Sequence, residues 1–434
     1  MEIVCDLGFV IWYFLNTMDF KKFKKRLILF LAVLGPGVIT AVANNDAAGV
    51  ATYTLSASLY GMSAQAFFMV TMVLLAVTQD IGARIAIVTG KGLGDLIREH
   101  YGVKISVAIF AVYFVVNQAV VLQNVSGLKA GLQLLSPHWQ SLLLVVCGLL
   151  VASVVFLNFK SLQKLFLLTI FFYFAYVASA LLIKPDWLAS LKTSLFSPER
   201  EYVYDLNYWF TIIAVLGTTI TAWGQFFIHS FVADKGLKPS QIKTERLEVY
   251  LGAALTVMFS WLMAVAVSYT LHTHGIVAED GASAARALIP LAGEFASYLF
   301  ALGLLGASFL GLTIVPLATA YVFGEFFGFE RTLNATFAKG RLFYIFFILQ
   351  IVLGLLLTFW SQINLFDITL YANYLNGALV PLVFFFLIKF SGDKTLMGEK
   401  HVTRGFSRFF LQAASVVIIF AVVVTFVGKL FFNN

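Results

Sequence analysis

Long apolar runs recur along this chain of 434 residues, and they limit the folds open to it more than any other feature. Each run is about as long as the ~20 residues that a helix needs to cross a bilayer. Hydrophobic residues make up 60% of the chain and charged residues 12%, against about 25% charged in soluble domains. We therefore predict an all-α membrane protein with eleven spans, at residues 27–60, 64–89, 105–127, 140–158, 165–183, 207–233, 248–271, 296–323, 342–360, 366–388 and 409–428.

Lysine and arginine are shared unevenly between the two sides that these spans define. The N-terminal segment, residues 1–26, and every second connection after it hold 22 basic residues, and the other side holds six. Because basic loops stay in the cytoplasm, we predict a cytoplasmic N-terminus, an extracytoplasmic C-terminus and a place in the plasma membrane. The net charge of +7 then reflects topology, so the expected neighbour is the lipid bilayer and not nucleic acid. We expect a monomer.

The first span is interrupted near its middle by Asn44, Asn45 and Asp46, and small residues follow up to Gly49. A carboxylate at mid-membrane costs about 2.5–3.5 kcal/mol on insertion scales. A helix broken at that depth is tolerated only where it lines a cavity or is buried in protein, and its freed carbonyl groups can bind a cation. Asp46 is therefore predicted to be functional. The alternative is that it only satisfies the amides of the broken helix and binds nothing.

A second break lies in the span at 207–233, where Thr218, Thr219, Thr221 and Gly224 interrupt an apolar helix. The two broken spans open two successive sets of five. Broken helices at corresponding positions of two halves indicate the binding site of a secondary transporter. An isolated threonine usually bonds its own backbone carbonyls, so the prediction depends on the paired breaks.

Other polar residues inside the spans have both a structural and a functional interpretation. Asp80 and Arg84 are four residues apart and share a helix face, which favours a structural or gating ion pair. His229, beyond the second break, either relays protons or is a buried, hydrogen-bonded histidine. Asn373 and Asn376 either contact substrate or join helices.

The residues GPGVITAVANNDAAG at 35–49 resemble the first helix of the NRAMP family of divalent-metal transporters. The likeness covers most of residues 27–390 in order, and it is clearest in three further segments, at 83–102, 217–230 and 299–308.

This resemblance implies the LeuT-type fold, in which two five-helix repeats of inverted topology are followed by an eleventh helix. Helices 1 and 6 of that fold are broken. The chain then divides into a cytoplasmic N-terminal segment, a first repeat, a second repeat, and a cytoplasmic loop with the eleventh helix, at residues 1–26, 27–206, 207–390 and 391–434.

The family's aspartate is retained as Asp46, but other positions of the family's site carry different residues. By the resemblance, the family's ligand asparagine falls on Gly49, its methionine on Thr221 and its histidine on Trp223. The acidic pair of the third span is missing, and Asn124 lies near its expected place. This pattern resembles the NRAMP-related magnesium transporters, a branch that lacks the methionine. Thioethers favour softer metals, whereas carboxylate, carbonyl and water suit magnesium and manganese.

We therefore predict a transporter of Mg²⁺, with Mn²⁺ also accepted, that works by alternating access and without the family's proton coupling. The predicted ligands are the Asp46 carboxylate, the carbonyls of Ala43 and Thr218, and the side chains of Asn45, Thr221 and Asn373, with Gly49 leaving room for water. The predicted polar pathway or gate comprises Asn124, Trp223, His229, Asp80 and Arg84.

Two alternatives stay open: a proton-coupled Mn²⁺ or Fe²⁺ importer, and an amino-acid transporter of the same superfold. An intramembrane enzyme is disfavoured because a single core carboxylate has no catalytic partner. The ion is the transported substrate, and no cofactor is expected.

Overall fold

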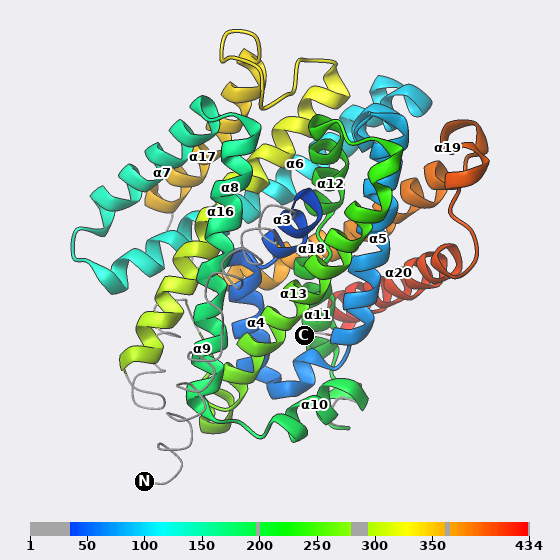
Figure 1. Ribbon diagram of the computed structural model, residues 1–434. Coiled ribbons are helices and arrows are strands. Elements are labelled where there is room, and N and C mark those ends of the chain that lie inside the picture. The colour runs from blue at the N-terminus through cyan, green and yellow to red at the C-terminus, as the bar shows by residue number, and fades with distance from the viewer. Residues whose placement is uncertain (1–34, 197–199, 279–293, 361–364, 433–434) are drawn as a thin grey trace, which may run out of the picture. The chain divides into compact units, whose positions relative to one another are not determined.

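A computed structural model describes residues 35–196, 200–278, 294–360 and 365–432. The described residues form helices and no strand (Figure 1). The predicted segment 1–26 and the start of the first span lie outside them. The α-helices are α3 (Pro36–Ala43), α4 (Ala47–Tyr60), α5 (Phe68–Thr89), α6 (Leu93–Leu135), α7 (Trp139–Phe156), α8 (Phe159–Ile170), α9 (Phe174–Ile183), α10 (Trp187–Phe196), α11 (Leu206–Thr219), α12 (Ala222–Lys235), α13 (Ile242–Ser268), α16 (Glu294–Phe327), α17 (Arg341–Trp360), α18 (Leu365–Ser391), α19 (Lys394–His401) and α20 (Phe406–Phe432).

The helices of the described residues provide ten candidate membrane spans, judged by length and composition. They follow ten of the predicted spans in order, and the first predicted span appears as the short pair α3 and α4. One boundary differs from the prediction. Residues 93–101 form a helical turn region ahead of the third span, and Gly102, with φ of 78°, separates the two parts of α6. A positive φ is readily adopted only by glycine, so the chain bends there.

Close helix packing holds the two broken spans in place. The most extensive contacts between helices join α16 to α6, α11 to α18, and α13 to α3. A Cβ on Gly252 of α13 would lie 2.8 Å from the Cα of Val38 on α3, and a Cβ on Gly217 of α11 would lie 2.4 Å from the amide nitrogen of Gly377 on α18. Small residues let membrane helices approach at the backbone. They anchor α3 and α11, the first halves of the two breaks.

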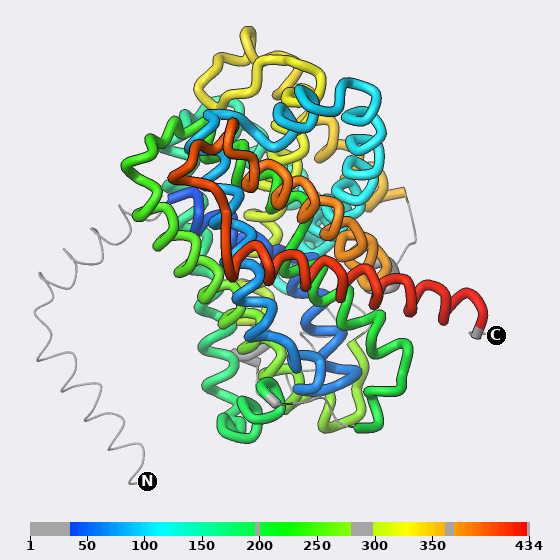
Figure 2. Tube along the Cα trace, turned by 90° about the vertical axis from the view of Figure 1, so that its right-hand side faces the viewer, coloured from blue at the N-terminus to red at the C-terminus, as the bar shows by residue number. Residues whose placement is uncertain are grey.

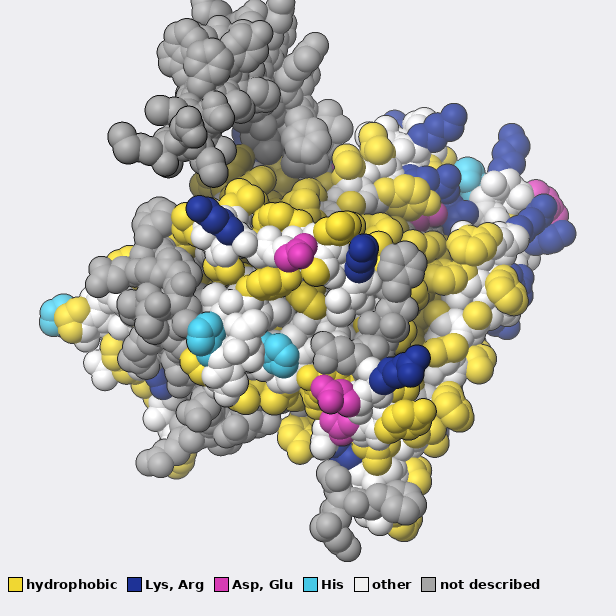
Figure 3. Space-filling model, turned by 90° about the horizontal axis from the view of Figure 1, so that it is seen from below, with side chains coloured by type: hydrophobic (Ala, Val, Ile, Leu, Met, Phe, Trp, Pro, Cys, Tyr) yellow, Lys and Arg dark blue, Asp and Glu magenta, His cyan; other side chains and the backbone are white. Residues whose placement is uncertain are grey.

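The outer helices present apolar side chains, as expected of a surface in contact with lipid. Phe420 of α20 is 68% exposed and Leu149 of α7 is 65% exposed. Figure 2 shows α20 at the edge of the bundle. Figure 3, a view of the lower end, shows charged and histidine side chains among hydrophobic ones. This arrangement fits a protein that sits in a bilayer.

The connections that the charge bias assigns to one side also gather at one end. In Figures 1 and 2, α19 and the connections after α5 and α16 lie at the upper end, and α10 lies at the lower end. Asp95, at the start of α6, forms an ion pair with Arg331 from the connection after α16. This grouping agrees with the predicted sidedness, although which end faces the cytoplasm stays a prediction.

Candidate ion site at the two helix breaks

The first break is a tight turn that ends α3 and begins α4. The amides of Asn44, Asn45 and Asp46 donate to the carbonyls of residues 41–43 at 3.0–3.2 Å, three residues back. Asp46 is the N-cap of α4, and its Oδ1 accepts the amide of Gly49 at 2.9 Å. Its side chain is buried, and the positive end of the α4 dipole favours its negative charge.

Asn124 of α6 completes the surroundings of the Asp46 carboxylate. Its Nδ2 donates to Asp46 Oδ2 at 2.7 Å and also to the carbonyl of Val120 at 2.9 Å, while its Oδ1 accepts the amide of Ala47 at 2.9 Å. Helix α16 closes over this pair, because a Cβ on Gly311 would lie 2.1 Å from Asn124 Oδ1 and 2.7 Å from Asp46 Cβ. A second carboxylate at position 124 could not donate to Asp46 while both were ionised.

The second break repeats this design with a neutral residue. Thr221 is the N-cap of α12, and its Oγ1 accepts the amide of Gly224 at 2.9 Å. The same hydroxyl donates to Asn44 Oδ1 at 2.7 Å, so Asn44 joins the two breaks directly. The amide of Ala222, the first residue of α12, donates to Asn376 Oδ1 of α18 at 2.9 Å. Asn44 was not among the predicted site residues, although its neighbours Asn45 and Asp46 were.

Asn45 contacts groups outside the second break, and its predicted place in the ion's oxygen shell stays a prediction, because its Oδ1 is buried and has no partner among the described residues. Its Nδ2 donates to the carbonyl of Thr256 on α13 at 2.7 Å, and its own carbonyl accepts the Tyr173 hydroxyl at 2.9 Å. The Ala43 carbonyl, another predicted ligand, accepts the Asp46 amide at 3.1 Å and keeps one lone pair. Asn45 therefore fastens the break to its surroundings.

Gly49 and Thr218 lie together beside Asn44. A Cβ on Gly49 would be 2.8 Å from the carbonyl oxygen of Asn44 and 3.5 Å from Thr218 Oγ1. The structure thus brings these predicted residues to one place, between α4 and the end of α11. Their roles as ion neighbours stay predictions.

Asn373 of α18 contacts α4 beyond the break. Its Nδ2 donates to Thr52 Oγ1 at 2.7 Å, and that hydroxyl donates to the Ala48 carbonyl at 2.7 Å.

Some buried amide atoms around the breaks have no hydrogen-bond partner among the described residues. Such atoms are rare in folded proteins and are explained by bound water or an ion. They include Asn44 Nδ2, Asn45 Oδ1, Asn373 Oδ1 and Asn376 Nδ2.

The predicted ion pair of α5 has a closer third member. Asp80 lies 3.9 Å from Arg84, as an i,i+4 pair, but its Oδ1 accepts from Arg246 Nε at 2.7 Å. Arg84 Nη2 instead donates to Thr403 Oγ1 at 2.7 Å. Arg246 was not singled out from the sequence, because its contact with Asp80 joins helices that are distant in the chain. The cluster ties α5 to α13 and to the segment before α20.

His229 has the hydrogen-bonded, buried arrangement that was one of its two interpretations. Its Nδ1 lies 2.7 Å from the Gln225 carbonyl, and a Cβ on Gly82 of α5 would lie 2.8 Å from its Cε1. Its Nε2 and the Nε1 of Trp223 have no partner among the described residues. Both rings are fully buried in the protein. A role of either in a pathway or gate stays a prediction.

Glu325 of α16 is one of several buried carboxylates, and it was not singled out from the sequence. It accepts the amide of Gly94 at 2.8 Å and the hydroxyl of Ser230 at 2.6 Å, and Arg331 lies 3.4 Å away. Burial lowers the pKa of the Arg331 guanidinium, but the carboxylates of Glu325 and Asp95 outweigh burial and the pKa is raised. The sequence signal was the glycine-rich start of α6, since a Cβ on Gly94 would lie 2.7 Å from Glu325.

The chemistry at the breaks is that of one carboxylate among neutral oxygen donors. Among the residues the structure describes, no group of three or more His, Cys, Asp or Glu side chains could hold a metal ion by itself. Asp46 supplies the charge, and amide, hydroxyl and carbonyl oxygens surround it. A buried carboxylate where two broken helices meet, inside a bundle with ten candidate spans, defines a transporter built on broken helices.

The chain belongs to the Nramp family, described as natural resistance-associated macrophage protein-like, which matches residues 37–428. This confirms the family inferred from the resemblance. It also confirms that the chain is a transporter and not an enzyme.

Relatives and solved structures agree with this membership. A protein of Mesorhizobium japonicum named divalent metal cation transporter MntH is 25% identical over 412 residues, which is 91% of this chain and 88% of the relative. A Yersinia pestis protein of the same name is 26% identical over 381 residues, 85% of this chain and 88% of the relative.

Two solved structures share the fold. A manganese transporter of Eremococcus coleocola superposes with a TM-score of 0.67 at 15% identity, covering 93% of this chain and 88% of that one. MhsT in complex with L-phenylalanine gives 0.56 at 15% identity, covering 90% and 97%. The predicted LeuT-type fold is therefore confirmed as a fold class.

Proposed function

We propose that this chain transports divalent metal cations across the plasma membrane by alternating access, with Mg²⁺ as the preferred ion and Mn²⁺ also accepted. The relatives named as divalent metal cation transporters support the ion class. The observation that carries the proposal is Asp46, a buried carboxylate at the meeting point of the two broken helices. One negative charge at mid-membrane has its simplest explanation in a cation that it binds.

The donor set favours a hard ion. Thr221, and not a methionine, faces Asn44 at the second break. Mg²⁺ is commonly bound through one or two carboxylates and keeps several waters. The unpaired amide atoms of Asn44, Asn373 and Asn376 are suited to hold those waters. Manganese is also suited to carboxylate, carbonyl and water ligands, which is why we include it.

The neighbour of Asp46 argues against proton coupling at this position. Asn124 is an amide, and an amide does not titrate. Its Nδ2 donates to Asp46 and to Val120, and its Oδ1 accepts from Ala47, so its side chain is held in place. In our proposal the ion moves without a proton passing through position 124.

The matching design of the two breaks supports the inverted five-helix repeats proposed for residues 27–206 and 207–390. Each break has an N-cap side chain that accepts an amide three residues on. Rocking of one repeat against the other would expose the breaks to each side in turn. We further propose a monomer with its N-terminus in the cytoplasm and its C-terminus outside.

Flux into proteoliposomes tests the proposal. Mg²⁺ and Mn²⁺ uptake would be recorded together with internal pH, with protein-free liposomes as the control. We expect uptake of both ions, with Mg²⁺ preferred, and no internal acidification. Acidification that follows Mn²⁺ uptake would favour the proton-coupled importer. Uptake of an amino acid with no metal flux would favour an amino-acid transporter of the same superfold.

A further inference from the structure

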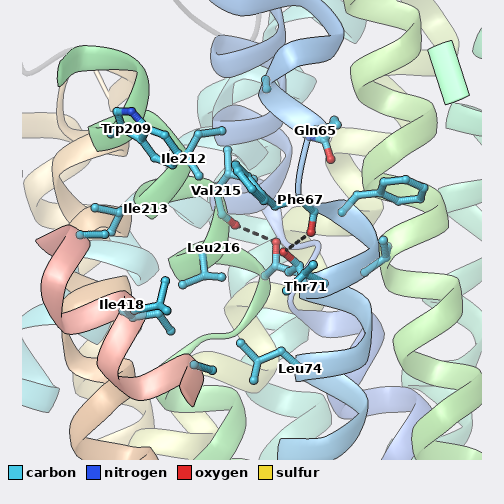
Figure 4. A pocket seen from close by; sticks show the side chains of 18 of the residues that line it. Gln65, Phe67, Thr71, Leu74, Trp209, Ile212, Ile213, Val215, Leu216 and Ile418 are labelled. Carbon is cyan, nitrogen blue, oxygen red and sulfur yellow. Dashed lines mark hydrogen bonds between the residues drawn. The ribbon is translucent and has the colours of Figure 1, made fainter. Parts of the chain in front are cut away.

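An apolar pocket lies between the first half of α5, the helix α11 and α20, and it ends beside the second break at Thr219. Its volume is about 310 Å³. Figure 4 shows Gln65 at one end and Leu74 at the other, with Leu216 of α11 and Ile418 of α20 on its walls. All three helices are candidate spans, so the pocket lies within the membrane and water is not its natural filling.

The lining is apolar even where the sequence is polar. The hydroxyl of Thr71 donates to the Phe67 carbonyl at 3.0 Å, and the hydroxyl of Thr219 donates to the Val215 carbonyl at 2.7 Å (Figure 4). Both hydroxyls are used within their own helices. The pocket therefore suits a hydrocarbon and offers nothing to a metal ion.

One polar group at the end of the pocket is not used. Gln65 is 3% exposed, and its Nε2 has no hydrogen-bond partner among the described residues. This nitrogen is enclosed by the protein and does not reach the pocket. The occupant is therefore selected by the apolar walls.

The length of the pocket corresponds to one leaflet. It runs along α11 from Trp209 to Thr219, ten residues on, close to the second break. At a rise of 1.5 Å per residue this is about 15 Å, half of the ~30 Å hydrocarbon core. Trp209 is the type of residue found at the membrane interface. A hydrocarbon chain in this pocket would thus begin at the interface and end near mid-membrane.

We propose that this pocket binds one acyl chain of a phospholipid from the leaflet at the Gln65 end. The site is distinct from the ion site and does not depend on which ion is transported. The pocket contacts the broken helices at Thr219, because the hydroxyl of this residue also lies 2.7 Å from the Tyr53 hydroxyl of α4. A bound acyl chain therefore packs against the wall that joins the two broken helices.

Photocrosslinking tests this site with the full-length protein in proteoliposomes. The probe is a phosphatidylcholine with a diazirine on its acyl chain, and the crosslinked peptides are mapped by mass spectrometry. We expect crosslinks concentrated in residues 65–74, 209–219 and 410–421. Crosslinks spread evenly over the lipid-facing helices, α7 included, would overturn the proposal.

Matched variants of α20 test the pocket itself. Val417 lines the pocket and Val416 does not, yet they are 65% and 67% exposed. Val417→Trp should lower crosslinking in the pocket by about tenfold, because the indole fills its mouth, and Val416→Trp should leave it unchanged. Equal crosslinking in both variants would count against the site. If either variant fails to fold, the positions of the crosslinked peptides in the wild type still test the proposal.

Discussion

The two helix breaks are built alike but differ in charge. Asp46 and Thr221 are the N-caps of α4 and α12, and each accepts the amide of a glycine three residues on, Gly49 and Gly224. An asparagine from another helix then accepts the first amide of each half-helix. The break at Thr221 shows that a neutral hydroxyl is enough to end one helix and start the next.

It follows that the negative charge of Asp46 is not required by the geometry of the break. Aspartate and threonine are both good N-caps and differ by little in helix stability. A charge at mid-membrane carries a cost that a hydroxyl avoids. The comparison therefore indicates that the Asp46 charge is retained for its ligand, and the predictions below either break this comparison or sharpen it.

The largest effect is expected from removing the charge. Asp46→Asn keeps a capping oxygen and loses the charge, so divalent uptake should fall by about 100-fold, equivalent to ~2.7 kcal/mol. It should also lose about 1–3 kcal/mol of stability, because its Nδ2 would face the Asn124 Nδ2 donor. Asp46→Ala should lose uptake and also about 1 kcal/mol of stability through the lost cap. Uptake would be measured in proteoliposomes, with Glu399→Gln on the surface as the control. Wild-type uptake in Asp46→Asn would mean that the charge only serves the fold.

The next effect concerns the packing around Asp46. Gly311→Ala would place a Cβ 2.1 Å from Asn124 Oδ1, so either the asparagine or α16 must move. We expect a loss of about 1–3 kcal/mol in the free energy of unfolding and reduced uptake. Gly148→Ala in α7 is the matched control, since its Cβ would meet nothing within 4 Å. Equal stability of the two variants would show that this packing is looser than described.

The third prediction sharpens the difference at the second break. Thr221→Met returns a thioether to the place that the family resemblance assigns to methionine. Softer ligands favour softer metals, so the ratio of apparent affinities for Cd²⁺ and Mg²⁺ should shift toward Cd²⁺ by about tenfold, or ~1.4 kcal/mol.

A change in the cap alone must be separated from this effect. Thr221 also accepts the Gly224 amide and donates to Asn44, contacts that methionine cannot make. Thr221→Ala loses these contacts without adding sulfur, and Thr221→Ser retains them. If Thr221→Ala and Thr221→Met lower all fluxes equally with an unchanged ratio, the position does not face the ion.

The smallest expected effect concerns only the labelling of introduced cysteines by a thiol reagent. Helix α12 leaves its break toward the predicted cytoplasmic side, and α11 begins on the other side. In a background without Cys5 and Cys147, Lys238→Cys should resist an impermeant thiol reagent in intact cells. Tyr204→Cys, 91% exposed, should react. Labelling of Lys238→Cys but not of Tyr204→Cys would reverse the predicted topology. The half-helices α11 and α12 would then run in the opposite direction across the membrane.

The spans and both breaks could be predicted because apolar length and polar interruptions are local properties of the sequence. The direction in which each side chain points at a break could not be predicted from the sequence. The tight turn at Asn44–Asp46 sends Asn44 to Thr221 and Asn45 to Thr256, and no helical periodicity holds within such a turn. Predicting from the sequence alone which asparagine meets the second break would require the turn's backbone angles.

Contacts between distant segments were the second limit. The i,i+4 spacing of Asp80 and Arg84 is visible in the sequence, but the shorter contact of Asp80 with Arg246 arises only when α5 packs on α13. Glu325 was missed for the same reason, since its partners come from α6 and α12. Sequence patterns report neighbours along one helix and not across several.

The most direct test of the central claim is equilibrium Mn²⁺ binding, followed by the loss of the free-ion signal in electron paramagnetic resonance and competed with Mg²⁺. The wild type should bind one Mn²⁺ that Mg²⁺ displaces, and Asp46→Asn, still folded at the temperature of the measurement, should bind none in the same concentration range. Binding by Asp46→Asn equal to that of the wild type would contradict the account, because the charge at the first break would then have no part in holding the ion.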